Sequence, residues 1–381
     1  LLLMQAGYQV QGVTLRLRAD GQEDDLDSAR AVADKLGIPH TVLDQRELFQ
    51  HTVMDRFVSE YVAGRTPNPC VDCNRCVKFG ALLDWALEQG ADYLATGHYA
   101  RVDRDPASGR YLLLRGLDRR KEQSYFLYQL TQHQLSHLLF PVGDYEKPAL
   151  RALAEAHGFA NAHRADSQDI CFIPGGDYMA FLEEYGGVTP QPGDFVDTQG
   201  RLLGRHKGLE RYTTGQRKGL GVSADAPLYV VRKDPASNTV VLGPDSALYS
   251  RELIADAFNW ISVPEPSAPL TVTAKTRYSQ REDGAAAQVL PDGSVQVSFT
   301  VPQRAVTAGQ AVVLYDGERV AGMHFTFPSR LSAYDGTVSL DLTAEGEYCP
   351  LTLEQVKKVV PQTRSMEFRG MPNLGGVGEY L

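Results

Sequence analysis

VQGVTLRL (residues 10–17) opens the part of the chain that decides the fold, because apolar and polar residues alternate in it as they do in a strand. The residues that follow, up to Thr96, alternate between helical and strand-like spacing. This order is typical of a parallel α/β sheet, whose ligands bind beyond the carboxyl ends of the strands. Leu15–Leu17 and Thr96–His98 are expected at such ends. The strand-like stretches are 10–17, 41–43 and 93–96, and the helical ones are 29–36, 47–62 and 79–87.

The sequence changes character after about residue 190, where glycine and proline separate short runs of β-forming residues. Such a pattern is typical of all-β domains with hairpin connections. A chain of 381 residues is also long for one domain, so we expect several folded parts and a tail of unassigned fold. The expected parts are 1–175, 176–245 and 246–327, and the tail is 328–381.

Charge is unevenly distributed along the chain, whose formal net charge is −9. Residues 101–121 carry seven Lys/Arg against three Asp, and residues 201–218 carry six against one Glu. Two basic stretches on an acidic protein could bind a polyanion on one face, although ordinary solvated surface is the commoner explanation. Arg217 and Lys218, in the second stretch, are candidate contacts to a nucleic-acid backbone.

The chain carries no sign of a membrane segment or a secretory signal. No segment approaches the roughly 18 apolar residues of a membrane span. The start, LLLMQAG, has no basic region and no cleavage-like site. It has the pattern of the end of an amphipathic helix, which predicts a chain truncated inside its first helix. We therefore expect a cytoplasmic protein, without a membrane partner and monomeric.

Five cysteines, an odd number in a long chain, favour reduced thiols over a disulfide framework. Three of them are spaced C-x2-C-x2-C, which leaves three interpretations open. They are small buried hydrophobes, or ligands of a metal or iron–sulfur cluster with Cys171 as a fourth, or a reactive thiol before a helix. The cysteines are Cys70, Cys73, Cys76, Cys171 and Cys349.

The third interpretation predicts a lowered thiol pKa. If Asn74 to Lys78 open the helix that follows, Cys73 lies at its N-terminus, where the helix dipole favours a thiolate. Arg75 and Lys78 would add positive charge. Before the cluster, two prolines stiffen the loop around Asn68, whose amide suits recognition of a planar polar group such as a nucleobase edge; a plain proline-rich turn is the simpler alternative.

Taken together, the motifs of this chain resemble those of the tRNA-specific 2-thiouridylases (the MnmA family), which belong to the PP-loop ATP pyrophosphatases. The resemblance covers about residues 1–325 and rests on many separate motifs. Among them are GRTPNPCVDCNRCVKFGALL (64–83), GADYLATGHYARV (90–102), KEQSYFLYQL (121–130), ADSQDICFIP (165–174), YTTGQRKGLG (212–221), RYSQ (277–280) and QRAVTAGQAVVLYDG (303–317).

The resemblance implies a fold and a set of site residues. The fold is a Rossmann-like (adenine nucleotide alpha hydrolase-like) α/β domain, a small central β-rich domain and a C-terminal β-barrel. Cys73 matches the nucleophile and Cys171 the persulfide carrier, while Leu15 and Gly97 match positions that hold ATP. No metal ligand is implied among the protein residues. The implied tRNA contacts are Asn68, Pro69, Cys70, Lys121, Glu122, Gln123, Arg277 and Tyr278, with Glu122 in place of the usual Asp.

The activity implied by the resemblance is 2-thiolation of the wobble uridine of tRNA. ATP with Mg²⁺ would adenylate the C2 oxygen of uracil, and a persulfide on Cys171, loaded by an upstream sulfur donor, would deliver the sulfur. The family's phosphate loop, SGGVDSS, is not among these residues, which predicts an incomplete ATP site, and the tail with Cys349 matches nothing in the family. Two alternatives stay open: an iron–sulfur-dependent sulfurtransferase using Cys70, Cys73 and Cys76, and a tRNA-binding fragment without ATPase activity.

Overall fold

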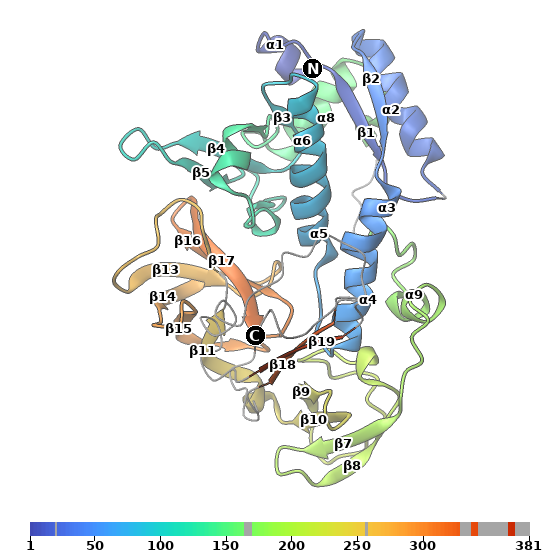
Figure 1. The fold of residues 1–381 in the computed structure, drawn as a ribbon, viewed down its shortest axis with the longest axis vertical. Coiled ribbons are helices and arrows are strands. Elements are labelled where there is room, and N and C mark those ends of the chain that lie inside the picture. The colour runs from blue at the N-terminus through green and yellow to red at the C-terminus, as the bar shows by residue number, and fades with distance from the viewer. Residues whose placement is uncertain (20, 164–169, 256–257, 328–336, 342–364, 370–381) are drawn as a thin grey trace.

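A computed structural model describes residues 1–381 apart from 20, 164–169, 256–257, 328–336, 342–364 and 370–381 (Figure 1). The N-terminal part begins as the sequence pattern predicts. Strand β1 (Gly12–Arg16) pairs in parallel with β2 (His40–Asp44), and helix α2 (Glu23–Leu36) connects them. Gly37 ends this helix because its φ of 66° is the left-handed conformation that glycine adopts without strain.

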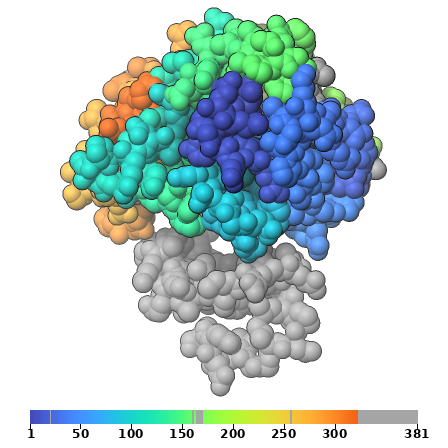
Figure 2. Space-filling model, turned by 90° about the horizontal axis from the view of Figure 1, so that it is seen from above, coloured from blue at the N-terminus to red at the C-terminus, as the bar shows by residue number. Residues whose placement is uncertain are grey.

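The third predicted strand is present but lies in a separate parallel pair. β3 (Leu94–Ala95) is shorter than expected and pairs with β6 (Leu138–Leu139), a strand that the periodicity did not reveal. In the described residues the parallel sheet is therefore two separate pairs. The first residues, with α1 (Leu2–Gln5), lie between the part of the chain that carries the β1–β2 pair and the part that carries the β3–β6 pair (Figures 1 and 2).

Two long helical rods carry the predicted helices 47–62 and 79–87. In Figure 1 both descend from the parallel strands toward the β-rich half of the molecule. Each rod contains a π-helical segment, in which the backbone hydrogen bonds run from residue i to i+5. The first rod comprises α3 (Arg46–Phe49), a π-helix (Gln50–Met54) and α4 (Asp55–Val62); the second comprises α5 (Pro69–Asp72), a π-helix (Cys73–Ala81) and α6 (Leu82–Glu88).

The residues after 190 form β-structure, as their sequence pattern predicts. Four strands make a small sheet in the order β8-β7-β10-β9. Six later strands, in the order β11-β15-β14-β13-β16-β17, close into a barrel because β11 also pairs with β17. The small-sheet strands are β7 (Gly193–Asp197), β8 (Leu202–His206), β9 (Tyr229–Asp234) and β10 (Thr239–Gly243), and the barrel strands are β11 (Tyr249–Ala255), β13 (Leu270–Lys275), β14 (Asp283–Val289), β15 (Val295–Arg304), β16 (Ala311–Asp316) and β17 (Arg319–Phe327).

The barrel also continues into the N-terminal part of the chain. The hairpin β4 (Ala100–Arg104) and β5 (Tyr111–Arg115) joins the edge of β17 through Arg319 and Leu114. One hydrophobic core follows this junction, because Phe79 and Tyr125 pack with Val313 from the barrel. The N-terminal part and the barrel are therefore separate in sequence but share one hydrophobic core. Other elements are α7 (Gln132–Ser136), α8 (Lys147–Ala156), α9 (Tyr178–Glu184), β12 (Asn259–Trp260), β18 (Thr337–Asp341) and β19 (Ser365–Arg369).

Cys349 and most of the expected tail lie outside the described residues. Within the described part of the chain, no helix combines the length and the apolar character that crossing a membrane requires.

Candidate active site

The loop TPNPC leads directly into the second helical rod. Asn68 is the N-cap residue, and its side chain accepts a hydrogen bond from the backbone N–H of Cys70 at 3.2 Å. Pro69 is buried and occupies the first helical position, where its missing N–H is not needed. The helix therefore begins at Pro69. The expectation that residues 74–78 open the helix is wrong, and Cys73 lies in the second turn.

Cys73 is a buried thiol, with 8% of its surface exposed. Burial raises the pKa of its thiol to about 12, although the charge of Lys78 opposes the shift. The expected lowering of the Cys73 pKa by a helix N-terminus is therefore wrong for this conformation. Removal of a thiolate from water outweighs the partial charge of a helix end, which acts only within the first turn.

Lys78 lies in the same π-helical segment as Cys73. The N–H of Leu82 bonds to the carbonyl of Val77, five residues earlier, so residues five apart lie about one turn apart on the same side. Cys73 and Lys78 have this spacing. The charge of Lys78 lowers the pKa of Cys73 and also of Cys171, against the desolvation that raises both. The sequence contained the lysine but no sign of the π-helix.

Cys171 lies exposed on a turn that the aromatic core holds in place. The N–H of Ile173 bonds to the carbonyl of Ile170 at 2.8 Å, which closes the turn. Phe172 is buried, and its ring centroid lies 5.7 Å from that of Phe49 on α3 and 5.4 Å from that of Phe57 on α4. The same core cluster contains Cys73.

The structure thus brings two distant cysteine motifs together. Desolvation raises the pKa of the exposed Cys70 thiol, Lys78 opposes this, and the charge of Cys171 adds to it. Cys70, Cys73, Cys76 and Cys171 are all free thiols. Among the described residues, no three His, Cys, Asp or Glu side chains converge as metal ligands would, so the geometry does not favour the iron–sulfur alternative.

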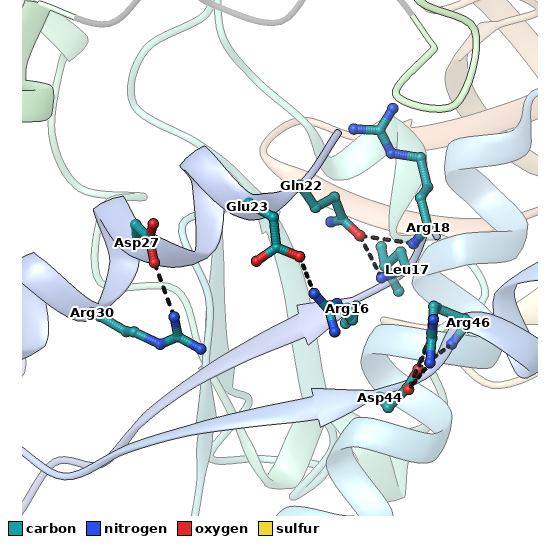
Figure 3. Close-up of polar contacts among 9 residues, drawn as sticks. All are labelled: Arg16, Leu17, Arg18, Gln22, Glu23, Asp27, Arg30, Asp44 and Arg46. Carbon is teal, nitrogen blue, oxygen red and sulfur yellow. Dashed lines mark hydrogen bonds and ion pairs between the residues drawn. The ribbon is translucent and has the colours of Figure 1, made fainter. Parts of the chain in front are cut away.

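The carboxyl end of β1 borders the site, because Leu15 and Leu17 pack against the cluster that contains Cys73. Figure 3 shows the polar contacts around this strand end. Leu15 lies within β1 and pairs with Leu43 of β2. Beyond it, the side chain of Gln22 accepts hydrogen bonds from the backbone N–H groups of Leu17 and Arg18, each at 2.7 Å. The guanidinium of Arg18 donates to the carbonyl of Gly21, and its charge lowers the pKa of Cys171 against desolvation. A second cation therefore accompanies Lys78 near the exposed thiol.

Gly97 and His98 follow β3 at the second strand end. A Cβ added to Gly97 would meet no atom within 4 Å, so this position borders open space. His98 is buried, its ring packs against Phe79 and Phe140, and its Nδ1 lies 2.8 Å from the hydroxyl of Thr96. Burial lowers the pKa of His98 to about 3, with Lys78 adding to the shift. This is the environment of a satisfied, neutral core histidine.

His98 should make the fold sensitive to mild acid. Its pKa is near 3 in the folded chain and about 6.5 when unfolded, so between these values the unfolded state binds the extra proton. We expect His98 to remove about 2 kcal/mol from the free energy of unfolding as the pH falls from 7 to 5. Urea titrations of the wild type and His98→Gln at both pH values test this. An equal loss in both proteins would contradict it.

The predicted contacts at 121–123 are only partly available at the surface. Glu122 is buried, with 4% exposure, and its carboxylate accepts a hydrogen bond from the N–H of Ser124 at 2.6 Å. The side chain of Gln123 accepts from the N–H of Tyr99 at 3.0 Å. Lys121 is half-buried and lies in the electrostatic surroundings of Tyr278. Burial raises the pKa of Tyr278, and the positive charge of Lys121 opposes this rise.

Arg277 and Tyr278 lie in the loop between β13 and β14. The ring of Tyr278 is 38% exposed and packs against Phe126 at a centroid distance of 4.4 Å. The 121–126 and 277–278 motifs thus come together. The guanidinium of Arg277 is engaged within the protein, because its Nη2 donates to the carbonyls of Thr214 and Ala305 at 3.1 and 2.7 Å.

Most described arginines of the two basic stretches are paired with carboxylates. In the 201–218 stretch, Arg217 and Lys218 are exposed and form no ion pair among the described residues. Lys207 of the same stretch is likewise exposed and without an ion pair among the described residues. The ion pairs are Arg101 and Arg119 with Glu318, Arg115 with Glu282, Arg201 with Asp197, Arg205 with Asp194, and Arg211 with Glu183.

Comparison with family models accounts for most of the chain. A tRNA methyl transferase HUP domain matches residues 1–175, a tRNA methyl transferase PRC-barrel domain matches 179–244, and an aminomethyltransferase beta-barrel domain matches 250–323. They confirm the expected fold class, an α/β domain followed by a small central β domain and a β-barrel.

Comparison with whole proteins finds relatives of nearly the same length. A tRNA-specific 2-thiouridylase MnmA of Acetivibrio thermocellus is 46% identical over 333 residues, which are 84% of this chain and 93% of that relative. Those of Heliobacterium modesticaldum and Clostridioides difficile are 49% and 44% identical, and the matches span 84% of this chain and 86% and 92% of the relatives.

Proposed function

The chain belongs to the family of tRNA-specific 2-thiouridylases (MnmA), and on that premise we propose that it replaces the C2 oxygen of a wobble uridine in tRNA with sulfur. It is then a tRNA sulfurtransferase that uses ATP and two thiols, Cys171 and Cys73. The observation that carries the proposal is the meeting of these cysteine motifs, 98 residues apart in sequence, in one core cluster.

Cys171 is the proposed sulfur carrier. It is exposed, so a donor protein can load its thiol with a persulfide, and its turn is anchored by buried Phe172. A persulfide sulfur that attacks carbon must be anionic. Arg18 and Lys78 supply positive charge to this position, since both lower the pKa of Cys171 against the desolvation that raises it. The two cations therefore favour the reactive form of the transferred sulfur.

Cys73 is the proposed resolving nucleophile. Its sulfur attacks the Sγ of Cys171, a Cys73–Cys171 disulfide forms, and the outer sulfur leaves with the bonding electron pair toward the uracil C2. The proton of Cys73 must be lost in this step. A buried thiol with a pKa near 12 is a poor nucleophile, so binding of tRNA must change its surroundings. An external thiol returns two electrons to the disulfide before the next turnover.

ATP, when bound with Mg²⁺, would supply the adenylyl group that makes the uracil C2 oxygen a good leaving group. The residues present fit the base side of such a nucleotide, because Gly97 borders open space beside the end of β3. Leu15 would flank it from β1. The N–H groups of Leu17 and Arg18 already bond to Gln22, so this turn offers them to no phosphate.

The remaining site residues would position the uridine. Asn68 and Pro69 form the rigid start of the helix, and the exposed Cys70 lies next to them at its first turn. The charge of Cys171 raises the pKa of Cys70, so Cys70 belongs to the electrostatic surroundings of the proposed sulfur carrier. Lys121, Glu122, Gln123, Arg277 and Tyr278 belong to the proposed tRNA interface. We also propose a monomeric cytoplasmic protein that meets a persulfide-bearing sulfur donor.

A methyl transferase, as the description of two family models has it, is the competing assignment. Cys73 and Cys171, two free thiols whose motifs meet in one core cluster, are groups that sulfur transfer needs and methyl transfer does not. A direct test incubates the chain with unmodified tRNA, ATP, Mg²⁺ and a persulfide donor. Retardation of the tRNA in a mercury-containing gel that depends on ATP would support the proposal. Methylated but unthiolated tRNA in the presence of a methyl donor would overturn it.

Arg217 and Lys218 should contribute to tRNA binding through charge alone. Affinity for tRNA falls as salt rises, and the double variant Arg217→Gln/Lys218→Gln is expected to weaken this dependence. The slope of log affinity against log salt should decrease in magnitude by about 1.4 to 1.8, because each lost phosphate contact removes roughly 0.7 to 0.9. Filter binding at several salt concentrations measures the slope. The matched control is Arg205→Gln, which removes a cation already paired with Asp194. Equal slopes for the double variant and wild type would contradict the prediction.

A further inference from the structure

Residues 305–311, which are the connection between β15 and β16 together with the first residue of β16, are the place where several predicted tRNA-contact segments meet. They belong to the motif QRAVTAGQAVVLYDG, to which the proposed chemistry gives no role. Ala305 has a φ of 56°, a left-handed conformation that a non-glycine residue adopts only when its surroundings enforce it. Ala305 is also buried, with 2% of its surface exposed. The connection is thus a constrained part of the barrel.

Arg277 is one of the groups that hold this connection. Its Nη2 donates to the carbonyl of Ala305 at 2.7 Å, to the hydroxyl of Thr307 at 2.5 Å and to the carbonyl of Thr214 at 3.1 Å. Thr214 belongs to the turn that precedes Arg217. One guanidinium nitrogen therefore ties the β13–β14 loop to both the connection and the central basic turn.

The other side of the connection holds the start of the active-site loop. The N–H of Thr66 donates to the carbonyl of Ala308 at 3.1 Å, and Gln310 Nε2 donates to the carbonyl of Thr66 at 2.6 Å. Thr66 lies two residues before Asn68, the N-cap of the thiol-bearing helix. The backbones of Gly309 and Thr66 approach each other closely, because a Cβ added to Gly309 would lie 3.0 Å from the Thr66 nitrogen.

The 121–126 motif reaches the same connection. The hydroxyl of Tyr125 donates to the carbonyl of Ala311 at 3.0 Å, and Tyr125 is buried. Its neighbour Phe126 supports the ring of Tyr278. Three segments, which contain Thr66, Tyr125 and Arg277, therefore make hydrogen bonds directly to residues 305–311. A fourth, the turn with Thr214, is linked to them through Arg277.

Arg277 is poorly placed to serve as a phosphate ligand. Its Nη2 already serves three protein acceptors, and its Nε is buried and has no hydrogen-bond partner among the described residues. A phosphate oxygen would have to displace protein carbonyls to form the usual bidentate pair. The contacts that exist are those of a clamp between segments.

We propose that residues 305–311, clamped by Arg277, are a positioning hub that holds the active-site loop and the tRNA-contact segments in register. Arg277 then acts on the reaction through Thr66 and Tyr278 and not by binding a phosphate. The inference rests on the proposed function in so far as the ordered segments serve tRNA. Its structural half, the coupling of Arg277 to the active-site loop, concerns the protein alone.

The first test separates a clamp from a phosphate contact by salt dependence. Arg277→Gln is expected to lower kcat by about 10²-fold, because small displacements of a reacting group have effects of that size. The slope of log affinity for tRNA against log salt is expected to stay at the wild-type value. A slope lower by about 0.9, the value for one lost phosphate contact, would overturn the proposal. Arg281→Gln, an exposed cation of the same loop, is the control for charge loss alone.

Arg277→Lys sharpens this test. Lysine keeps a point charge for a phosphate, but its side chain is one bond shorter, so its ammonium does not reach the place from which Nη2 serves three acceptors. We expect it to resemble Arg277→Gln in kcat. Wild-type kcat in Arg277→Lys together with loss in Arg277→Gln would show that charge, and not the clamp, is what matters.

The second test needs no tRNA. Hydrogen exchange in peptides covering residues 64–72 is expected to become at least about tenfold faster in Arg277→Gln, because the Thr66 amide bonds to the clamped connection. Gln310→Leu should give the same effect, and the double variant should add little to either. Unchanged exchange in these peptides would overturn the hub even if thiolation is real. Faster exchange without any thiolation in the wild type would instead support the hub and reject the proposed function.

Discussion

Replacing Cys171 by serine is expected to abolish tRNA thiolation, with a loss of about 10³-fold or more in single-turnover rate. A serine hydroxyl cannot carry a persulfide, so the chain would lack its sulfur carrier. Cys73→Ser is expected to cause a comparable loss for a different reason, since the persulfide would form but would not be resolved. The gel assay described above measures both rates.

Mass spectrometry of the loaded protein separates the two variants. After exposure to a persulfide donor, Cys73→Ser should carry one extra sulfur at Cys171, and Cys171→Ser should carry none at that position. Cys76→Ser is the matched control, because Cys76 is partly buried in the same core but has no proposed role. Near-normal thiolation by either Cys73→Ser or Cys171→Ser would contradict the two-thiol mechanism. A loss in Cys76→Ser as large as in Cys73→Ser would revive the cluster alternative.

Cys73 in the free, folded protein is expected to react with iodoacetamide about 10³-fold more slowly than the same residue in the unfolded chain. Its pKa of about 12 leaves little thiolate at pH 7.5, whereas an unfolded cysteine has a pKa near 8.5. Because the folded pKa is raised, the thiolate fraction and the rate should rise about tenfold per pH unit from pH 7 to 10 without a plateau. Digestion and mass spectrometry after timed labelling give the rate at each cysteine.

Two comparisons make the labelling result specific. Cys171 and Cys70 are exposed and should be labelled first. Saturating tRNA should then increase labelling of Cys73 if substrate binding activates it, provided that Cys171 is replaced by serine so that no disulfide forms. A plateau for Cys73 between pH 7 and 9 in the free protein would mean that its thiolate is already stabilised, contrary to its burial.

Regular periodicity predicted the outline of the fold. The alternation in 10–17 and the helical spacing of 29–36 identified β1 and most of α2, because both depend on neighbouring residues only. The same argument could not reveal that the hairpin formed by 100–104 and 111–115 joins the barrel, since one edge contact between Leu114 and Arg319 decides it. Pairing between distant strands leaves no local pattern.

The site shows the same limit. The motifs predicted which thiols matter for the proposed chemistry, but the pKa of Cys73 was predicted with the wrong sign. The helix starts at Pro69, and packing against Phe172 and Ile173 buries the thiol, which no spacing of cysteines can indicate. The π-helical winding that orients Lys78 was equally invisible. The sequence also contained no sign that Arg277 is engaged within the protein, because its three acceptors come from residues 28 to 63 positions away.

The central claim is that Cys73 resolves the sulfur carried by Cys171, and the product of one turnover tests it most directly. The persulfide-loaded chain is mixed with tRNA and ATP without any reductant, quenched in acid and digested. Mass spectrometry of the peptides should find Cys73 joined to Cys171 by a disulfide in proportion to the thiolated tRNA formed. A disulfide between Cys70 and Cys171, or thiolated tRNA with all four thiols still free, would contradict the account.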